Sequence, residues 1–454
     1  MDSYGLLTLI PPLVIIVFAV VTRRTFPALI LGVVLCYIIM NGITFFTPFI
    51  DGIYAVLTDA DTIWVILLTG FIGVFIAIVS NSGGIDALTQ YILKIATNRK
   101  RTLLGTWLLG MLFFIGDVSN IGTIGVTMKS SADRNKVPRE ALAYVLDSTA
   151  APVCVLVPIS SWGVFFAGIF MAEKSLGFTG NPISMYVHII PFMFYSMAAI
   201  VVVFLFAAGI IPPIGQMKKA YARVDTTGMV YSEKSAQFNI DTDAEVKQEP
   251  AWKIIYFLLP LAILVIFAIM GKFLEGCIIA IFVALILYTA TKAMTFTKFS
   301  KLCMDGFVSM LAPIFIIVGA FMVRDALVAM EMPAFISGVL EPVMNAQIYP
   351  ALVFLTVAVL SFTTGSNWGV PAVMVPILVP LGLALGSNPY ILLGAIASGG
   401  TFGSHACFYS DATVFTSAVT KIDNMEHALT QLPYALLSAG TAFILFIITG
   451  FAVN

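Results

Sequence analysis

Apolar segments about as long as a bilayer is thick recur along the whole chain. A membrane-spanning helix needs about 20 mainly apolar residues. In the first half the predicted spans cover 5–21, 26–46, 63–80, 141–171 and 187–213, with an interrupted apolar segment at 103–128. In the second half they cover 252–270, 274–291, 306–330, 390–420 and 428–452, with an interrupted segment at 350–385. The pattern predicts an all-α polytopic membrane protein.

Charge is too scarce for a soluble protein of this length. The 454 residues are 60% hydrophobic and only 10% charged, whereas a soluble domain carries about 25% charge. So few ionic groups exclude a soluble multidomain enzyme and a disordered chain. A net charge of −1 gives no case for nucleic-acid binding. The expected partner is the lipid bilayer, and no cofactor is expected.

The charges that do occur are concentrated at the middle of the chain. Eleven of the 47 Asp, Glu, Lys and Arg residues lie within 215–250. This segment is predicted to be a soluble linker. It divides the chain into a first transmembrane half at 1–214 and a second at 251–454.

The two halves show the same order of segments, and short sequence matches suggest a duplication. Asp-Ala-Leu at 86–88 recurs 239 positions later at 325–327. Ser-Asn-Ile-Gly at 119–122 resembles Ser-Asn-Trp-Gly at 366–369, 247 positions later. Each match is short, but together they favour an internal repeat.

The distribution of Lys and Arg predicts the orientation in the membrane. If the N-terminus is outside and both interrupted segments are re-entrant hairpins, 20 of the 23 basic residues lie inside. Only Lys174 and Lys272 then lie outside, whereas a simple crossing at 103–128 would move the basic cluster 129–139 outside. Each repeat therefore has five spans and one hairpin, with the second repeat inverted. Both termini are predicted outside and the linker cytoplasmic, an arrangement typical of secondary transporters.

Four segments are predicted to interrupt helices within the membrane. They are 116–122, 148–162, 363–371 and 398–411. Proline removes a helical donor and glycine permits positive φ, so carbonyl and hydroxyl oxygens become free to bind Na⁺. Exposed helix N-termini suit an anionic group of a substrate. The alternative is that these small and hydroxylic residues only pack helices together.

Ionisable residues inside the predicted spans are few. Asp117 lies in the first interrupted segment, and Asp147, His405 and Asp411 lie in the broken spans. A carboxylate inside a span is costly without a partner and by default suggests a functional site. Asp117 and Asp411 are predicted to bind Na⁺, to carry a proton, or to do both in competition.

Three of the ionisable groups also have a structural interpretation. Asp147 can lie near the cytosolic end and pair with a basic residue such as Arg139. His405 can be a hydrogen-bonded core histidine. Arg324 can anchor a substrate carboxylate, or it can pair with a neighbour such as Asp325.

Longer motifs resemble the NhaC-type Na⁺/H⁺ antiporter family. The motifs are SSADRNKVPREALAYVLDSTAAPVCVLVPISSWG at 130–163, FTTGSNWGVPAVMVPI at 362–377, FGSHACFYSDAT at 402–413 and DNMEHALTQLPYAL at 423–436. The resemblance implies a multi-pass secondary transporter of a bacterial or archaeal inner membrane. It also implies a scaffold and a mobile part that moves as an elevator. Members of the family that this sequence resembles include Na⁺/H⁺ antiporters, a malate–lactate exchanger and carriers of amino acids or related solutes.

The polar positions of the family motifs can be placed on this chain. They fall on Asp117, Ser119, Asn120, Asp147, Ser148, Thr149, Ser160, Ser161, Thr364, Gly365, Ser366, Asn367, Trp368, His405, Ser410 and Asp411. These residues are predicted to bind ions or substrate, with Na⁺ at Asp117, Asn120, Asn367 and Asp411. Na⁺, H⁺ or both are the expected coupling ions.

Some motif positions depart from the family pattern. Ser404 stands where the family usually has Asp, and the bulky pair Phe408 and Tyr409 follows it. Fewer carboxylates and more aromatic surface suit an organic solute. Two functions therefore stay open: Na⁺/H⁺ antiport with or without a solute, and Na⁺- or H⁺-coupled transport of an amino acid or small carboxylic acid without simple exchange. A homodimer is one arrangement that the sequence leaves open.

Overall fold

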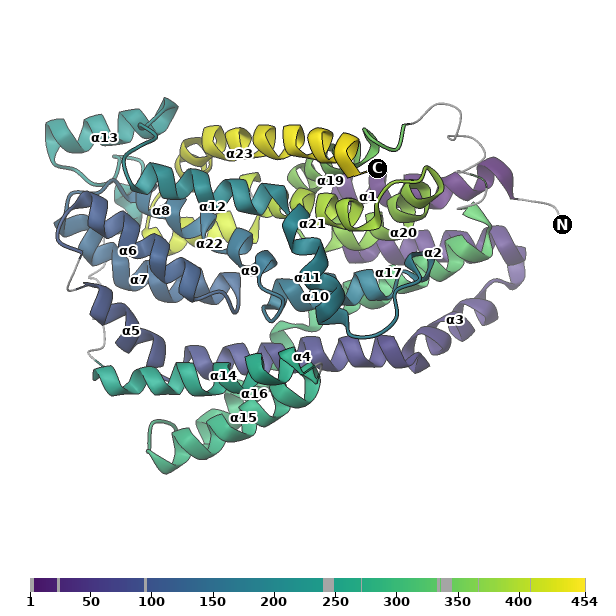
Figure 1. Cartoon of the computed structure of the whole chain (residues 1–454), viewed down its shortest axis with the longest axis horizontal. Helices are drawn as coiled ribbons and strands as arrows, with labels where there is room; N and C mark the ends of the chain where they lie inside the picture. The colour runs from purple at the N-terminus through teal and green to yellow at the C-terminus, as the bar shows by residue number, and fades with distance from the viewer. Residues whose placement is uncertain are drawn as a thin grey trace.

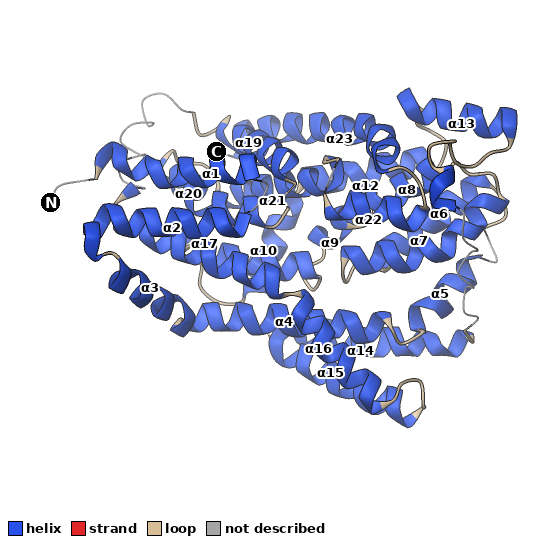
Figure 2. Ribbon diagram, turned by 180° about the vertical axis from the view of Figure 1, so that it is seen from behind, coloured by secondary structure: helices blue, strands red, loops and turns tan. Residues whose placement is uncertain are grey.

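A computed structural model describes nearly the whole chain. It covers residues 4–22, 25–93, 96–239, 249–270, 272–332, 335, 345–365, 367–408 and 410–453. Ser366, Tyr409 and the linker positions 240–248 lie outside the described residues. Within the described part every regular element is a helix (Figure 2), as predicted.

The helices of the first half occupy residues up to Ala207. They are α1 (Ile10–Thr22), α2 (Thr25–Asn41), α3 (Phe46–Thr58), α4 (Ala60–Ser80), α5 (Gly84–Leu93), α6 (Arg99–Leu112), α7 (Asp117–Arg134), α8 (Arg139–Ser148), α9 (Ala151–Leu156), α10 (Ser161–Met171), α11 (Pro182–Ile189) and α12 (Phe194–Ala207). The linker contains α13 (Gly215–Thr227).

The second half follows the same order. Its helices are α14 (Ile255–Ile269), α15 (Phe273–Ala290), α16 (Phe296–Ser309), α17 (Leu311–Ala329), α19 (Tyr349–Thr364), α20 (Gly369–Ala384), α21 (Pro389–Ala406), α22 (Asp411–Thr420) and α23 (Asn424–Val453). Among the described residues, seven helices are long and apolar enough to cross a membrane, or up to nine if each of two bent pairs is one span. The chain is a multi-pass membrane protein.

Corresponding helices start at a nearly constant spacing. The paired starts are Arg99 and Tyr349 for α6 and α19, Arg139 and Pro389 for α8 and α21, and Ser161 and Asp411 for α10 and α22, each 250 residues apart. For α1–α14, α2–α15, α3–α16, α4–α17 and α7–α20 the spacing runs from 245 to 252 residues. The Asp-Ala-Leu match does not follow this spacing, because it places the start of α5 opposite the end of α17.

Both interrupted segments are pairs of helices that pack together and return to the side where they began. At the base of the α6–α7 pair, Asn135 Nδ2 donates to Ala96 O at 2.8 Å. At the base of the α19–α20 pair, Ser387 Oγ donates to Ala346 O at 2.9 Å. Figure 1 places the two hairpins toward opposite ends of the molecule, with α13 beside the first.

The basic residues around the first hairpin lie on the side of the linker. Arg99, which begins α6, forms an ion pair with Asp225 of α13 at 2.7 Å. The backbone N–H of Arg139 donates to Val230 O at 2.9 Å. A simple crossing at 103–128 would separate these contacts, so they favour the hairpin interpretation of the basic cluster.

The predicted breaks are shorter in the structure than in the sequence analysis. The first hairpin tip is 113–116, because Asp117 already begins α7, and the second tip is 365–368. The span α21 stays helical through Ala406 and breaks only at 407–410. Its glycines serve close packing instead, since a Cβ on Gly399 would lie 2.7 Å from the Cβ of Val357 on α19.

A separate layer of helices crosses beneath the hairpin tips. Figure 1 shows α4, α14, α15 and α16 on one side of the molecule. Here α4 and α16 cross at Gly73 and Gly306, where a Cβ on either glycine would lie 2.4–2.5 Å from the carbonyl oxygen of the other. This close crossing of two backbones fixes one wall of the cavity described below.

Candidate functional site

A cavity of about 540 Å³ lies between the hairpin tips on one side and helices α4, α16 and α17 on the other. One wall consists of the first turn of α7, the start of α10, Trp368 at the second tip and Asp411 at the start of α22. All four predicted breaks therefore contribute to one place.

Asp117 fastens the first hairpin tip to the start of α10. Its Oδ1 accepts the N–H of Val118 at 2.9 Å, and its Oδ2 accepts the indole N–H of Trp162 at 2.9 Å. Close by, the backbone N–H of Ser161 donates to Ile115 O at 3.0 Å. The Asp117 side chain is only 7% exposed, yet the residue borders the cavity.

Asp411 has the matching place in the second half. Its Oδ1 accepts the N–H of Ala412 at 2.9 Å and the side-chain N–H of Asn367 at 2.8 Å. The bond to Asn367 fastens the second hairpin tip to the start of α22. Unlike Asp117, Asp411 is exposed, and the cavity is where it meets solvent.

Ser160 and Ser410, which are 250 residues apart, are equivalent helix caps. Each is the N-cap of the half-helix that follows a break. Each hydroxyl lies 2.5–2.6 Å from the carbonyl oxygen six residues earlier, to which it donates. Each also accepts the N–H three residues later, at 2.9 and 3.2 Å. These hydrogen bonds hold the breaks in shape.

The side-chain N–H groups of Asn120 are bound by the backbone, whereas its Oδ1 is buried without a partner within the described residues. Its Nδ2 lies 2.9–3.1 Å from the carbonyl oxygens of Gly110, Phe113 and Thr149. These bonds hold the end of α6 against the break after α8. Asn120 does not line the cavity, so of the four predicted Na⁺ ligands Asp117 and Asp411 border it directly and Asn367 contacts Asp411.

Two tryptophans fill the space between the Asp117 contacts at the first hairpin tip and the Asp411 contacts at the second. The rings of Trp162 and Trp368 have centroids 4.9 Å apart, and Phe165 packs edge-on against Trp368 at 4.7 Å. Trp162 is fully buried, whereas Trp368 is partly exposed and lines the cavity. Trp368 thus presents an aromatic surface to any bound solute.

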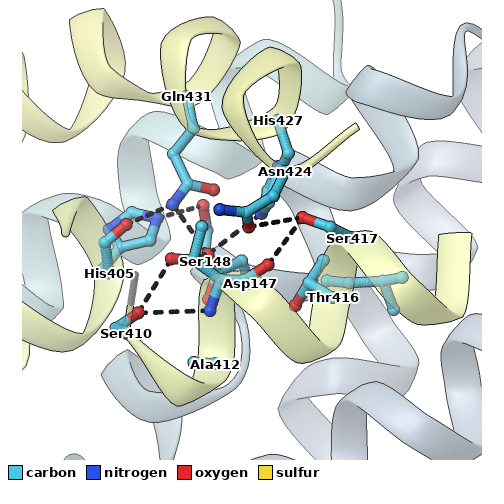
Figure 3. A network of polar contacts seen from close by, with 12 residues as sticks. Asp147, Ser148, His405, Ser410, Ala412, Thr416, Ser417, Asn424, His427 and Gln431 are labelled. Carbon is cyan, nitrogen blue, oxygen red and sulfur yellow. Dashed lines mark hydrogen bonds and ion pairs between the residues drawn. The ribbon is translucent and has the colours of Figure 1, made fainter. Parts of the chain in front are cut away.

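Asp147 belongs to a different, fully buried network (Figure 3). Its Oδ2 accepts the side-chain N–H of Gln431 at 2.7 Å and lies 3.2 Å from His427 Nε2 and 3.4 Å from Thr413 Oγ1. The predicted pairing with Arg139 is wrong, because Arg139 instead pairs with Asp133 at 2.8 Å. Asp147 faces α22 and α23.

His405 lies in the same network and is a hydrogen-bonded core histidine. Its Nε2 lies 2.8 Å from Ser148 Oγ, and its Nδ1 lies 2.7 Å from the hydroxyl of Tyr195. Gln431 also donates to the carbonyl oxygen of His405. His405 and Ser148 are therefore brought together with Asp147, away from the cavity wall.

The remaining predicted site residues have local roles or border the cavity. Ser119 and Ser161 line it. Thr149 and Thr364 donate to carbonyl oxygens of their own helices, at 2.8 and 2.7 Å. Gly365 ends α19 with φ of 65°, a conformation that favours glycine.

Arg324 does not reach the cavity. It forms an ion pair with Asp325 at 2.7 Å and donates to the carbonyl oxygen of Ala172. Its guanidinium also lies over the ring of Phe321, 5.0 Å from the centroid. The structural interpretation of Arg324, pairing with a neighbour, is confirmed.

Several polar residues of these sites were missed by the sequence analysis, among them one acidic residue at the cavity and two residues of α23. Asp305 of α16 borders the cavity, and His427 and Gln431 of α23 bind Asp147. His427 and Gln431 could have been found from the motif at 423–436, which resembles the family and contains both residues. Nothing in the local sequence singles out Asp305.

Packed hairpins, broken helices and a central cavity define a membrane transporter. The model of the Na⁺/H⁺ antiporter family matches residues 153–451, and the chain belongs to that family. The resemblance seen in the motifs is confirmed.

Relatives span either the whole chain or a short part of it. A protein of Haemophilus influenzae, itself uncharacterized, is 25% identical over 99% of this chain and 92% of its own length. The malate-2H⁺/Na⁺-lactate antiporter of Bacillus subtilis is 30% identical over 23% of each chain.

Two solved transporters share the fold. MtrF of Neisseria gonorrhoeae, from a class of antimetabolite efflux pumps, superposes with a TM-score of 0.64 at 15% identity, over 89% of this chain and 83% of its own. The YdaH transporter of Alcanivorax borkumensis, which has an unusual topology, gives 0.62 at 12% identity, over 87% and 90%.

Proposed function

We propose that the chain is a secondary active transporter in which Asp117 and Asp411 hold a coupling cation, Na⁺ or H⁺. The observation that carries the proposal is the position of these two carboxylates. Each begins a half-helix at a break, and both border the same cavity. Intramembrane carboxylates at such breaks are the usual ion sites of secondary transporters.

Competition between the two cations would supply Na⁺/H⁺ exchange. A carboxylate that has taken up a proton loses the charge that attracts Na⁺, so each ion displaces the other. Asp411 is the residue better placed for this exchange, because it is exposed to the cavity and Asp117 is nearly covered. Asn367 and Trp368 would complete the site from the second hairpin tip.

The size of the cavity favours an organic solute in addition to the ion. About 540 Å³ lies within the range of small-molecule pockets, roughly 300–1,000 Å³. The family match and the partial match to a malate–lactate antiporter support coupling between Na⁺, H⁺ and such a solute. The second candidate is accordingly cation-coupled transport of an amino acid or small carboxylic acid without simple exchange.

We further propose that the two halves are inverted repeats of five spans and a hairpin each. The 250-residue spacing of helix starts, the matched caps Ser160 and Ser410, and hairpins at opposite ends of the molecule support it. Helices α4, α16 and α17 would belong to the scaffold, and the hairpins with the broken spans would move as an elevator. Basic residues on the linker side favour a cytoplasmic linker, external termini and an inner-membrane location.

The test uses purified protein in liposomes. A Na⁺ gradient is imposed while internal pH and uptake of labelled amino and carboxylic acids are recorded. A pH response without added solute supports exchange, whereas Na⁺-dependent uptake without that response supports the second candidate. Asp411→Asn should abolish both responses. Asp225→Asn, in the exposed ion pair of the linker, is the matched control and should behave as wild type.

A further inference from the structure

A third carboxylate faces the cavity from the layer opposite the hairpin tips. Asp305 lies on α16, one residue before the crossing glycine Gly306, and both residues line the cavity. Its side chain is exposed, and within the described residues it forms no hydrogen bond or ion pair. Unlike Asp117 and Asp411, it is left free by the protein to bind something else.

The charged side chains that line the cavity are all acidic within the described residues. Among the described residues that line it, three are carboxylates and none is Lys, Arg or His. Four half-helices begin there, α7, α10, α20 and α22, and each contributes roughly half a positive charge. Four such ends offset about two of the three negative charges, so the empty site keeps a net negative charge.

A buried acceptor beside this wall also lacks a donor. Asn367 gives its N–H to Asp411 Oδ1 at 2.8 Å, but its own Oδ1 has no partner within the described part of the chain. The residue is only 2% exposed. A buried oxygen without a donor is costly; Asn367 does not itself line the cavity, but it contacts Asp411, which does.

The rest of the lining suits the body of an organic cation. Trp368 offers an aromatic face, on which an ammonium group gains cation–π attraction. Ile76 and Ile316 supply apolar surface between the acidic groups. A dicarboxylate would instead meet three carboxylates and no basic side chain among the described lining residues.

From this geometry we propose that the transported solute is a small organic amine with no net negative charge, whose ammonium group binds Asp305. The coupling cation stays with Asp117 and Asp411 on the hairpin side. The proposal rests on the proposed function, because it names the solute of the same cavity, and it adds Asp305 as the residue that selects it.

The test compares three probes with the same five-carbon chain: 1,5-diaminopentane, 5-aminopentanoate and glutarate. Their binding to the purified full chain is measured by titration calorimetry at fixed Na⁺. Binding should weaken in that order as positive charge is replaced by negative charge. In Asp305→Asn the diamine should bind at least about tenfold more weakly, as expected for loss of one charged hydrogen bond.

Binding of radioactive Na⁺ keeps this proposal separable from the proposed function. Asp305→Asn should bind Na⁺ as wild type does, whereas Asp411→Asn should not. If Asp305→Asn does not fold, Asp305→Glu keeps the charge, and it should retain the preference for the diamine. Tighter binding of glutarate, binding of none of the probes, or unchanged diamine binding in Asp305→Asn overturns the amine proposal while Na⁺ binding still stands. Loss of Na⁺ binding in wild type would overturn the proposed function instead.

Discussion

The cavity and the buried network around Asp147 use the same residue types in opposite ways. Asp411 is exposed to the cavity and receives two N–H donors on one oxygen. Asp147 is fully buried: three side chains from α22 and α23 surround its Oδ2, while its Oδ1 has no hydrogen-bond partner within the described residues. The Oδ2 of Asp147, whose partners the protein supplies, holds α8 against α22 and α23, whereas Asp411 lies at a cavity where a ligand can reach it.

The largest expected effect is on stability, in the buried network. Asp147→Ala removes the acceptor for His427 and Gln431 and leaves both buried without it. Breaking a buried charged contact on one side costs about 3–5 kcal/mol, so the variant should unfold at a markedly lower temperature. Thermal unfolding in detergent, followed by tryptophan fluorescence, measures this. A variant with wild-type stability and lost Na⁺ binding would instead place Asp147 with the cavity residues.

The next effect is on function, at the cavity. Asp411→Asn keeps an oxygen that can accept the N–H of Ala412, so stability should change by less than about 1 kcal/mol. Loss of the charge should weaken Na⁺ binding about 100-fold, equivalent to ~3 kcal/mol. Na⁺ binding and thermal unfolding are measured on the same sample. Normal Na⁺ dependence would remove Asp411 from the ion site and erase the contrast with Asp147.

Much of the fold follows from the placement of charge along the sequence. The basic cluster 129–139 required the segment at 103–128 to return to its own side, and the bond from Asn135 to Ala96 O closes that hairpin. The four breaks were predictable because proline and glycine limit helices in known ways. Their meeting at one cavity was also expected from the repeat.

The helix ends and the distant partners were not predictable. Asp117 was placed within a loop, but an acidic residue in the first turn of a helix is favourable, and α7 begins there. Asp305 fell just outside a predicted span that starts at 306, because the apolar signal begins later than the helix. His427 and Gln431 lie 280 and 284 residues from Asp147, and only packing of α8 against α23 brings them together.

A smaller and symmetric effect is expected at the two caps. Ser160→Ala and Ser410→Ala each remove an N-cap acceptor and a donor to a carbonyl oxygen. Each should cost about 1 kcal/mol of unfolding free energy, and the two costs should be similar. Thermal unfolding of both variants gives the comparison. A clear inequality would show that the two breaks are not equivalent, despite their 250-residue spacing.

The smallest effect sharpens the contrast between the cavity and the buried network. Thr416 lies in that network with its hydroxyl fully buried and, within the described residues, without a hydrogen-bond partner (Figure 3). Thr416→Val has nearly the same shape and removes the unpaired group, so stability should stay the same or rise slightly. A loss of more than about 1 kcal/mol in thermal unfolding would mean that a water molecule or an ion pairs with this hydroxyl. The network around Asp147, in which Asp147 Oδ1, His427 Nδ1 and Gln431 Oε1 also lack partners within the described residues, would then hold a bound water molecule or ion.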